Sequence, residues 1–265
     1  MIIINPISPV AFSIAGFAVR WYALAYIAAF VLGAWIFRKL SQRGGNKILS
    51  SKKAFDDLFT AMILGVIIGG RLGYVLFYNL PFFIAHPLEV IAIWNGGMSF
   101  HGGLLGVIIA AFLVARKQKI TTFSILDLLT VVAPIGLFFG RIANFINMEV
   151  MGRETTQPFG VVFAGTGDTV PRHASPLYEA TLEGLLLFII MFCLWKFTKL
   201  REKTGALSGI FAMLYACFRI FAEQFRAPDA QLGFLTSWGL TMGQLLSALM
   251  FIAGGIIFTI AMRKK

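Results

Sequence analysis

The sequence is poor in charged residues and in the residue types that build most soluble catalytic sites. Charged side chains make up 13% of its 265 residues, against about 25% in soluble domains. Histidine occurs three times and cysteine twice, with Cys193 and Cys217 inside apolar runs, so we expect neither a disulfide framework nor a bound metal. Neither His-x4-Asp nor Gly-x-Ser-x-Gly occurs, which disfavours a membrane acyltransferase and a phospholipid hydrolase.

Apolar residues are abundant instead, at 58% of the chain with a mean hydropathy of +0.82. Apolar runs near the roughly 20 residues that cross a bilayer recur along the whole length. We therefore expect an all-α membrane protein, a single integral membrane domain over 1–265, with about seven transmembrane helices. The expected spans are about 17–37, 55–78, 98–115, 125–147, 177–195, 206–225 and 239–262.

The basic residues are distributed unevenly between these spans. Most of the 23 lysines and arginines fall in the first, third and fifth connections and at the C-terminus, whereas the other connections contain only Arg153, Arg172 and Arg226. By the positive-inside rule the N-terminus faces outward and the C-terminus faces the cytoplasm. The net charge of +11 then reports topology and attraction to anionic lipid, and no nucleic-acid partner is expected. Residues 148–176 should form a small, turn-rich extracytoplasmic cap.

Four arginines fall within apolar spans, where each costs about 2.5–3.5 kcal/mol at the span centre. Snorkelling to the interface explains Arg20. For Arg71, Arg141 and Arg219 we favour a function, and the alternative is a structural ion pair inside the helix bundle. Arg219 and Glu223 are four residues apart and should pair with each other, which weakens Glu223 as an acid or base.

Arg141 has no carboxylate on its own helix face, because none occurs at 137, 138 or 145. We therefore expect it to bind an anion elsewhere. The abundant anion in a membrane is the phospholipid phosphate, which a guanidinium group binds in a two-pronged geometry.

Glycine is concentrated around one histidine, His101. The run Asn95-Gly-Gly-Met-Ser-Phe-His-Gly-Gly-Leu-Leu-Gly106 contains five glycines. This pattern predicts a broken span that lines a cavity, while close helix packing is the alternative explanation of the glycines. A functional and a structural role for His101 are equally compatible with the pattern.

The segment Gly140-Arg-Ile-Ala-Asn-Phe-Ile-Asn-Met-Glu-Val-Met-Gly152 resembles the signature of the prolipoprotein diacylglyceryl transferase family, and every fixed position is filled. The resemblance extends over nearly the whole chain but does not include 153–170. Further matching segments are Arg20-Trp-Tyr22, Gly69–Asn79, Trp94–Gly106, Pro171-Arg-His173, Leu177-Tyr-Glu179 and Phe218–Asp229.

The resemblance implies a membrane enzyme of the bacterial cytoplasmic (inner) membrane. Its donor would be phosphatidylglycerol, and its acceptor the lipobox cysteine thiol in the signal peptide of a prolipoprotein. The products would be a thioether and glycerol phosphate, with no cofactor. A transporter or channel would also have arginines inside its spans, but the sequence shows no repeat of the kind common in transporters.

The resemblance also implies site residues, each at the position that matches a family motif. His101 is the best candidate for a general base, although arginines alone could lower the pKa of the acceptor thiol, which is normally about 8.5. Arg141 and Arg219 are candidates for holding the leaving phosphate. The implied catalytic residues are His101, Arg141, Arg219 and Glu223. The implied substrate-binding residues are Tyr22, Arg71, Arg141, Asn144, Glu149 and Gly152.

Overall fold

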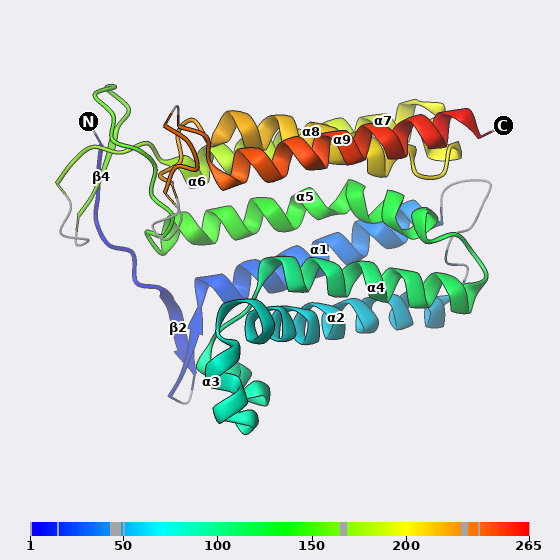
Figure 1. Cartoon of the computed structure of the whole chain (residues 1–265), viewed down its shortest axis with the longest axis horizontal. Coiled ribbons are helices and arrows are strands. Elements are labelled where there is room, and N and C mark those ends of the chain that lie inside the picture. Colours follow the sequence, from blue (N-terminus) through cyan, green and yellow to red (C-terminus); the bar gives the residue numbers. More distant parts are fainter. Residues whose placement is uncertain are drawn as a thin grey trace. The chain divides into compact units, whose positions relative to one another are not determined.

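A computed structural model describes residues 2–14, 16–42, 49, 51–164, 169–228, 233–237 and 239–264, and most of them are helical (Figure 1). The chain forms two compact units. Unit 1 comprises Met1–Phe37 and Leu129–Lys265, and unit 2 comprises Arg38–Leu128. Two helices, α1 (Trp21–Ser41) and α5 (Thr122–Ile146), each run from one unit into the other.

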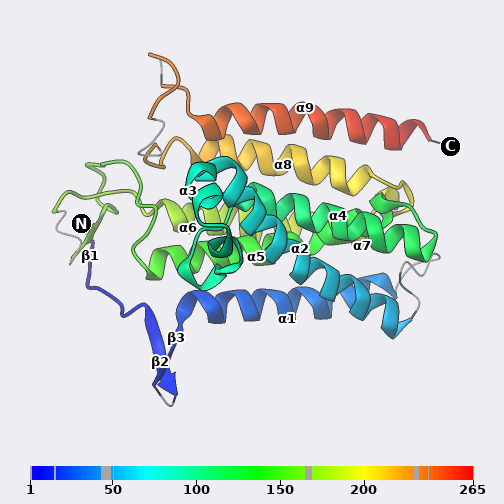
Figure 2. The ribbon, with the colours of Figure 1, turned by 60° about the horizontal axis from the view of Figure 1, so that its bottom comes forward.

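Unit 1 contains most of α1 and α5, three further long helical segments and four short strands. Within this unit, α5 runs side by side with α7 (Leu187–Phe197), α8 (Ala206–Ala222) and α9 (Met242–Arg263) in both ribbon views (Figure 1, Figure 2). Helices α8 and α9 approach so closely at Gly209 that a Cβ there would lie 2.7 Å from the backbone of α9. The remaining elements of this unit are β1 (Ile2–Ile4), β2 (Val10–Ile14), β3 (Phe17–Arg20), β4 (Val161–Phe163), α6 (Ser175–Glu179), the π-helix η3 (Ala180–Leu186) and η4 (Lys199–Glu202).

Unit 2 is built on a pair of long helices, α2 (Lys52–Tyr78) and α4 (Phe100–Gln118). Three short helices connect them: α3 (Leu80–Ala85), η1 (Pro87–Ile91) and η2 (Ile93–Asn95). The two long helices meet backbone to backbone through glycine, since a Cβ at Gly65 would lie 2.5 Å from the Gly106 carbonyl oxygen. Gly69 and Gly102 meet in the same way one turn along. Gly102 and Gly106 of the run around His101 therefore serve close packing, which was the alternative explanation of that run.

Five helical segments are long and apolar enough to cross a membrane: Trp21–Ser41, Lys52–Tyr78, Thr122–Ile146, Ser175–Phe197 and Met242–Arg263. They confirm five of the expected spans as candidates. The other two expected spans, 98–115 and 206–225, coincide with α4 and with α8, and α8 is a shorter apolar helix of 17 residues. Seven crossings and their orientation remain predictions.

The segment 148–176 is turn-rich over its described part, as expected. Its single strand β4 pairs in parallel with β1, in the register Ile2↔Val161 to Ile4↔Phe163. Val161, Phe163 and Ala174 are buried and form a small core with apolar side chains that include Ile4 and Phe145. This core ties the segment to the N-terminal strand and to the end of α5.

Candidate functional site

Six charged side chains meet inside unit 1, and Glu179 lies at their centre. Its Oε2 atom lies 2.8 Å from Nη2 of Arg141 and 2.8 Å from Nη1 of Arg219. Arg226 Nη1 is 3.5 Å from the same oxygen. One carboxylate oxygen thus holds guanidinium groups from α5, from α8 and from the turn after α8. We call this set the arginine–glutamate cluster: Arg141, Glu179, Glu183, Arg219, Glu223 and Arg226.

The π-helix η3 supplies the second carboxylate of the cluster. Glu183 lies 3.5 Å from Arg141 and 3.5 Å from Arg219, and its side chain, like that of Glu179, is 0% exposed. A π-helical turn is wider than an α-helical one and occurs often at functional sites. Here it places two glutamates four residues apart against the same two arginines.

The expected pair within α8 is confirmed. Arg219 Nη2 lies 2.5 Å from Glu223 Oε1, and the hydroxyl of Thr241 donates to Glu223 Oε2 at 3.0 Å. Thr241 is also the N-cap of α9 and forms a capping box with Gln244. Glu223 is therefore fixed from two helices, which suits a residue that orients Arg219.

Arg141 has no carboxylate partner on its own helix face, as expected, but it pairs with carboxylates elsewhere in the protein. Its partners, Glu179 and Glu183, lie in a different helical segment about 40 residues along the chain. A search of one helix face cannot find such a pair. Glu179 and Glu183 are charges within an apolar run, and Glu179 also ends the matching segment Leu177-Tyr-Glu179; these were the available signals of their role.

The arginine side chains of the cluster are partly exposed, whereas its carboxylates are buried. The side chains of Arg141, Arg219 and Arg226 are 21%, 13% and 15% exposed. In the described part of the chain, the ion pairs of Arg141 involve only its Nη2 atom. Three positive and three negative charges balance, and the accessible part of the cluster consists of arginine side chains. An anion that reaches the cluster from there meets arginine and not carboxylate.

The rest of the signature lies in the last turn of α5 and directly after it. The side-chain amides of Asn144 and Asn147 donate to the two oxygens of Glu149, at 3.1 Å and 3.3 Å. Asn144 is buried, whereas Glu149 is exposed. The predicted substrate-binding residues Asn144 and Glu149 are thus brought together, with the carboxylate oriented by two amides.

Gly152 is packed on both sides by backbone. A Cβ at this position would overlap the His173 carbonyl oxygen and lie 2.6 Å from the Phe225 carbonyl oxygen. The Gly152 N–H donates to that His173 carbonyl at 3.0 Å, and the Arg153 N–H donates to Phe225 at 2.8 Å. Close packing is enough to require glycine here, and its predicted role in substrate binding stays a prediction.

His173 lies beside this junction. Its Nδ1 atom is 3.2 Å from the hydroxyl of Tyr178, and its ring meets that of Phe225 edge to face at 5.1 Å. Burial lowers the pKa of His173 below its ordinary value of 6.5. We therefore expect a neutral imidazole at pH 7.

Tyr22 lies in the first turn of α1, where its ring is 5.1 Å from that of Tyr26. It belongs to unit 1, as does the arginine–glutamate cluster. Its predicted role in substrate binding stays a prediction.

Arg71, in unit 2, is enclosed by backbone carbonyl groups. Its guanidinium group donates to Glu89, Val90, Ala92, Gly96 and Gly97. These bonds use all of its N–H groups, and the residue is 5% exposed. Lipid binding by Arg71 would require some of these bonds to break.

His101 also belongs to unit 2 and is exposed in the first turn of α4. The hydroxyl of Ser99 caps this helix by accepting from the Gly102 N–H at 3.3 Å. The predicted break in the apolar run therefore lies at the start of a helix and not within one. The structure thus gathers Arg141, Arg219 and Glu223 in unit 1, and it places Arg71 and His101 in unit 2.

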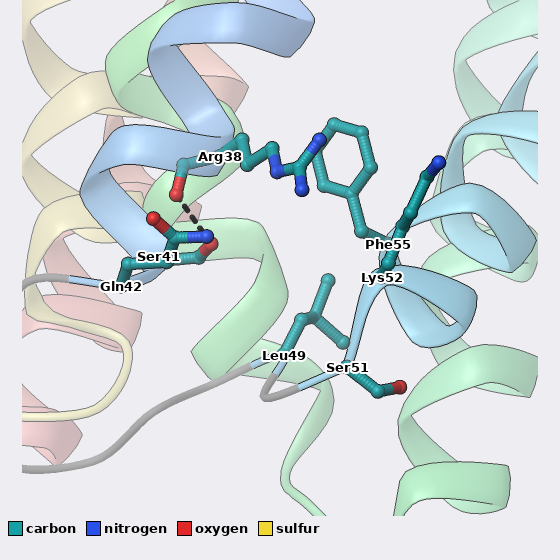
Figure 3. Close-up of a pocket in the computed structure, with 7 residues that line it drawn as sticks. All are labelled: Arg38, Ser41, Gln42, Leu49, Ser51, Lys52 and Phe55. Carbon is teal, nitrogen blue, oxygen red and sulfur yellow. Dashed lines mark hydrogen bonds between the residues drawn. The ribbon is translucent and has the colours of Figure 1, made fainter.

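A small pocket in unit 2 is separate from these groups. It lies where α1 ends and α2 begins, and its lining includes Arg38, Ser41, Lys52 and Phe55 (Figure 3). Arg38 extends toward the ring of Phe55, 5.6 Å from its centroid. The pocket has a volume of about 20 Å³, which accommodates a water molecule but not a lipid headgroup.

Comparison with known proteins gives a consistent result. The family model described as prolipoprotein diacylglyceryl transferase matches residues 9–260. A phosphatidylglycerol–prolipoprotein diacylglyceryl transferase of Rhodospirillum rubrum is 51% identical over 260 residues, which cover 98% of this chain and 94% of that protein. A protein of the same name from Methylocella silvestris is 48% identical over 98% of this chain and 95% of its own length. One from Azospirillum brasilense is 49% identical over 94% of this chain and 92% of its own length.

Proposed function

The chain belongs to the prolipoprotein diacylglyceryl transferase family, and from this premise we propose that it lipidates prolipoproteins. The reaction transfers the diacylglyceryl group of phosphatidylglycerol to the thiol of the lipobox cysteine. It yields a thioether and glycerol phosphate, and it is the first step of bacterial lipoprotein maturation. The relatives, named after the same donor and acceptor, support this assignment.

The bond changes define what the protein must supply. The thiol loses its proton, sulfur attacks the glyceryl carbon that carries the phosphate ester, and the carbon–oxygen bond breaks. A phosphodiester with one negative charge becomes a phosphate monoester that carries up to two. Negative charge therefore accumulates on the leaving group during the reaction, and preorganised donors that hold it lower the barrier.

The partly exposed arginine side chains of the arginine–glutamate cluster are the observation that carries the proposal. Arg141 and Arg219 converge on one carboxylate oxygen, so that their charges are fixed in place before the lipid arrives. Preorganised charge of this kind costs no rearrangement during the reaction. We assign Arg141 and Arg219 to the phosphate, and Glu223 to the orientation of Arg219.

The remaining assignments concern the acceptor and the lipid headgroup. His101 would take the thiol proton, since it is an exposed base in the part of the chain that resembles the family's His-Gly-Gly segment. Tyr22, Asn144, Glu149 and Gly152 would bind the substrate, and Glu149 is already held by two amides. Prolipoprotein signal peptides would be the partners that deliver the thiol.

The proposed site is that of a multi-pass membrane protein. We propose that it lies in the bacterial cytoplasmic (inner) membrane, with the N-terminus outside and the C-terminus in the cytoplasm. A chain with Cys193 and Cys217 replaced by serine tests the orientation. Gln157→Cys should react with a membrane-impermeant maleimide in intact cells, and Gln42→Cys only after the cells are permeabilised. The reverse result would overturn the orientation.

One assay tests the function itself. Purified protein is mixed with phosphatidylglycerol vesicles and a lipobox peptide, and the peptide is weighed by mass spectrometry. We expect its mass to increase by one diacylglyceryl group, and a peptide with serine in place of the lipobox cysteine to stay unmodified. An unmodified cysteine peptide, with the lipid and protein intact, would refute the proposal.

A further inference from the structure

Arg71 organises a complete segment of unit 2. The carbonyl groups that accept its hydrogen bonds all belong to residues 89–97, which comprise part of η1, all of η2 and the turn before α4. Carbonyl oxygens that converge on one point repel each other unless a cation or donor lies between them. The path of this segment therefore depends on the guanidinium group, whose cationic face also lies 5.1 Å from the ring centroid of Phe83.

The clamped segment leads directly to His101. Gly97 adopts φ +82°, and the ring of Tyr74 fills the place where its Cβ would be. Met98 packs on Gly70, the Ser99 N–H donates to the Gly70 carbonyl at 2.8 Å, and Ser99 then caps α4. His101 is the second residue of that helix. Contacts within unit 2 thus fix the backbone from Arg71 to the start of α4, which carries His101.

A direct role of Arg71 as a phosphate ligand fits these contacts poorly. A phosphate would have to displace carbonyl groups from a guanidinium that is 5% exposed. Arg141, by contrast, is 21% exposed and uses one nitrogen for its ion pairs. Arg71 also differs from the cluster arginines in having carbonyl groups, and no carboxylate, as its hydrogen-bond partners among the described residues.

We infer that Arg71 is a positioning residue for the transfer reaction: it fixes residues 89–97 and, through the start of α4, the imidazole of His101. This inference rests on the proposed role of His101. A displacement of about 1 Å at a reacting group can cost about 10²-fold in rate. Loss of the clamp should therefore lower kcat and leave the KM for phosphatidylglycerol nearly unchanged.

The test compares Arg71→Ala and Arg71→Lys in the full-length protein in detergent. Lysine keeps the charge but has three donors on one nitrogen, so it cannot serve all of the carbonyl groups. We expect both variants to lose about 10²-fold in kcat, and both to exchange backbone amide hydrogens faster over 87–99. A large rise in the KM for phosphatidylglycerol with kcat retained, or unchanged exchange over 87–99, would overturn the inference.

A second variant leaves Arg71 in place. Gly97→Ala forces a strained φ and a clash with Tyr74, so it should reproduce the loss in kcat and the faster exchange. Gly33→Ala in α1 is the matched control, because a Cβ there meets nothing within 4 Å. Normal kcat in a folded Gly97→Ala protein would also overturn the inference. Hydrogen exchange needs no turnover, so it tests the clamp even if the proposed transfer is not observed.

Discussion

Glu179→Gln removes the central charge of the arginine–glutamate cluster with almost no change in shape. Two ion pairs of 2.8 Å and one of 3.5 Å lose their carboxylate. Removal of one partner from a buried ion pair typically costs about 3–5 kcal/mol. We expect the lower end of that range, because among the described residues Glu179 Oε1 has no hydrogen-bond partner. The new amide N–H₂ can occupy that side while its oxygen still accepts from the arginines.

The same substitution changes the charge of the cluster from balanced to one positive charge in excess. A phosphate should then bind more tightly, and product release should slow. One unit of charge at about 4 Å corresponds to about 4 kcal/mol near a protein surface before screening by salt. We therefore expect inhibition by added glycerol phosphate to strengthen at least about tenfold, which corresponds to about 1.4 kcal/mol, while kcat falls.

The assay combines thermal unfolding in detergent with peptide lipidation at increasing glycerol phosphate. Asp57→Asn is the matched control, since it removes a carboxylate from the exposed 2.6 Å pair with Lys117, and such pairs contribute about 0–1 kcal/mol. A Glu179→Gln protein with the unfolding temperature, kcat and product inhibition of the unmodified chain would refute the reasoning, because the carboxylate would then not hold the arginines.

Three further predictions concern the same unit. Arg141→Lys should insert and fold but lose nearly all transfer, because lysine lacks the planar fork that suits phosphate; near-normal turnover of lipobox peptide would argue against two-pronged binding. Arg219→Met/Glu223→Leu should stay folded, since buried ion pairs are often replaceable by apolar residues, yet be inactive. Arg219→Ala should lose more transfer activity than Glu223→Gln. Transfer by the folded double variant would show that Arg219 does not hold the phosphate. Because the pKa of His173 is depressed in the folded protein, the unfolded state binds the proton more readily. The free energy of unfolding should therefore fall as the pH drops through about 6.5, and the loss should be complete below the folded pKa. The unfolding temperature of His173→Phe should lack this pH dependence, and a His173→Phe protein with the pH profile of the unmodified chain would contradict the prediction.

Much of the helical architecture could be predicted because a bilayer imposes a length and a composition on each span. Five expected spans coincide with helices that meet both conditions. The connections between spans were less predictable, because hydrogen bonding inside the protein, and not hydropathy, decides their path. The segment 79–99 is an example: its short helices depend on Arg71, whose acceptors lie 18 to 26 residues away in sequence.

The candidate site was predictable only where its partners are local. Arg219 and Glu223 are one helical turn apart, and their pairing is confirmed. The partners of Arg141 could not be identified, because packing between helices decides which distant carboxylate meets an arginine. The roles of Arg226 and Thr241 were missed for the same reason.

The π-helix between α6 and α7 has a consequence for how this chain can change over evolution. A π-helical turn amounts to one residue added to an α-helix, and here it lies between Glu179 and α7. Loss of any single residue from 180–186 other than Glu183 could restore a regular helix at little energetic cost. It would leave Glu179 and Glu183 on one helix face, because residues three or four apart share a face of an α-helix, but it would move α7 relative to both glutamates. We therefore expect active members of the family to keep the length of this stretch together with Glu183 and with Gly184, where a Cβ would lie 2.7 Å from Phe138.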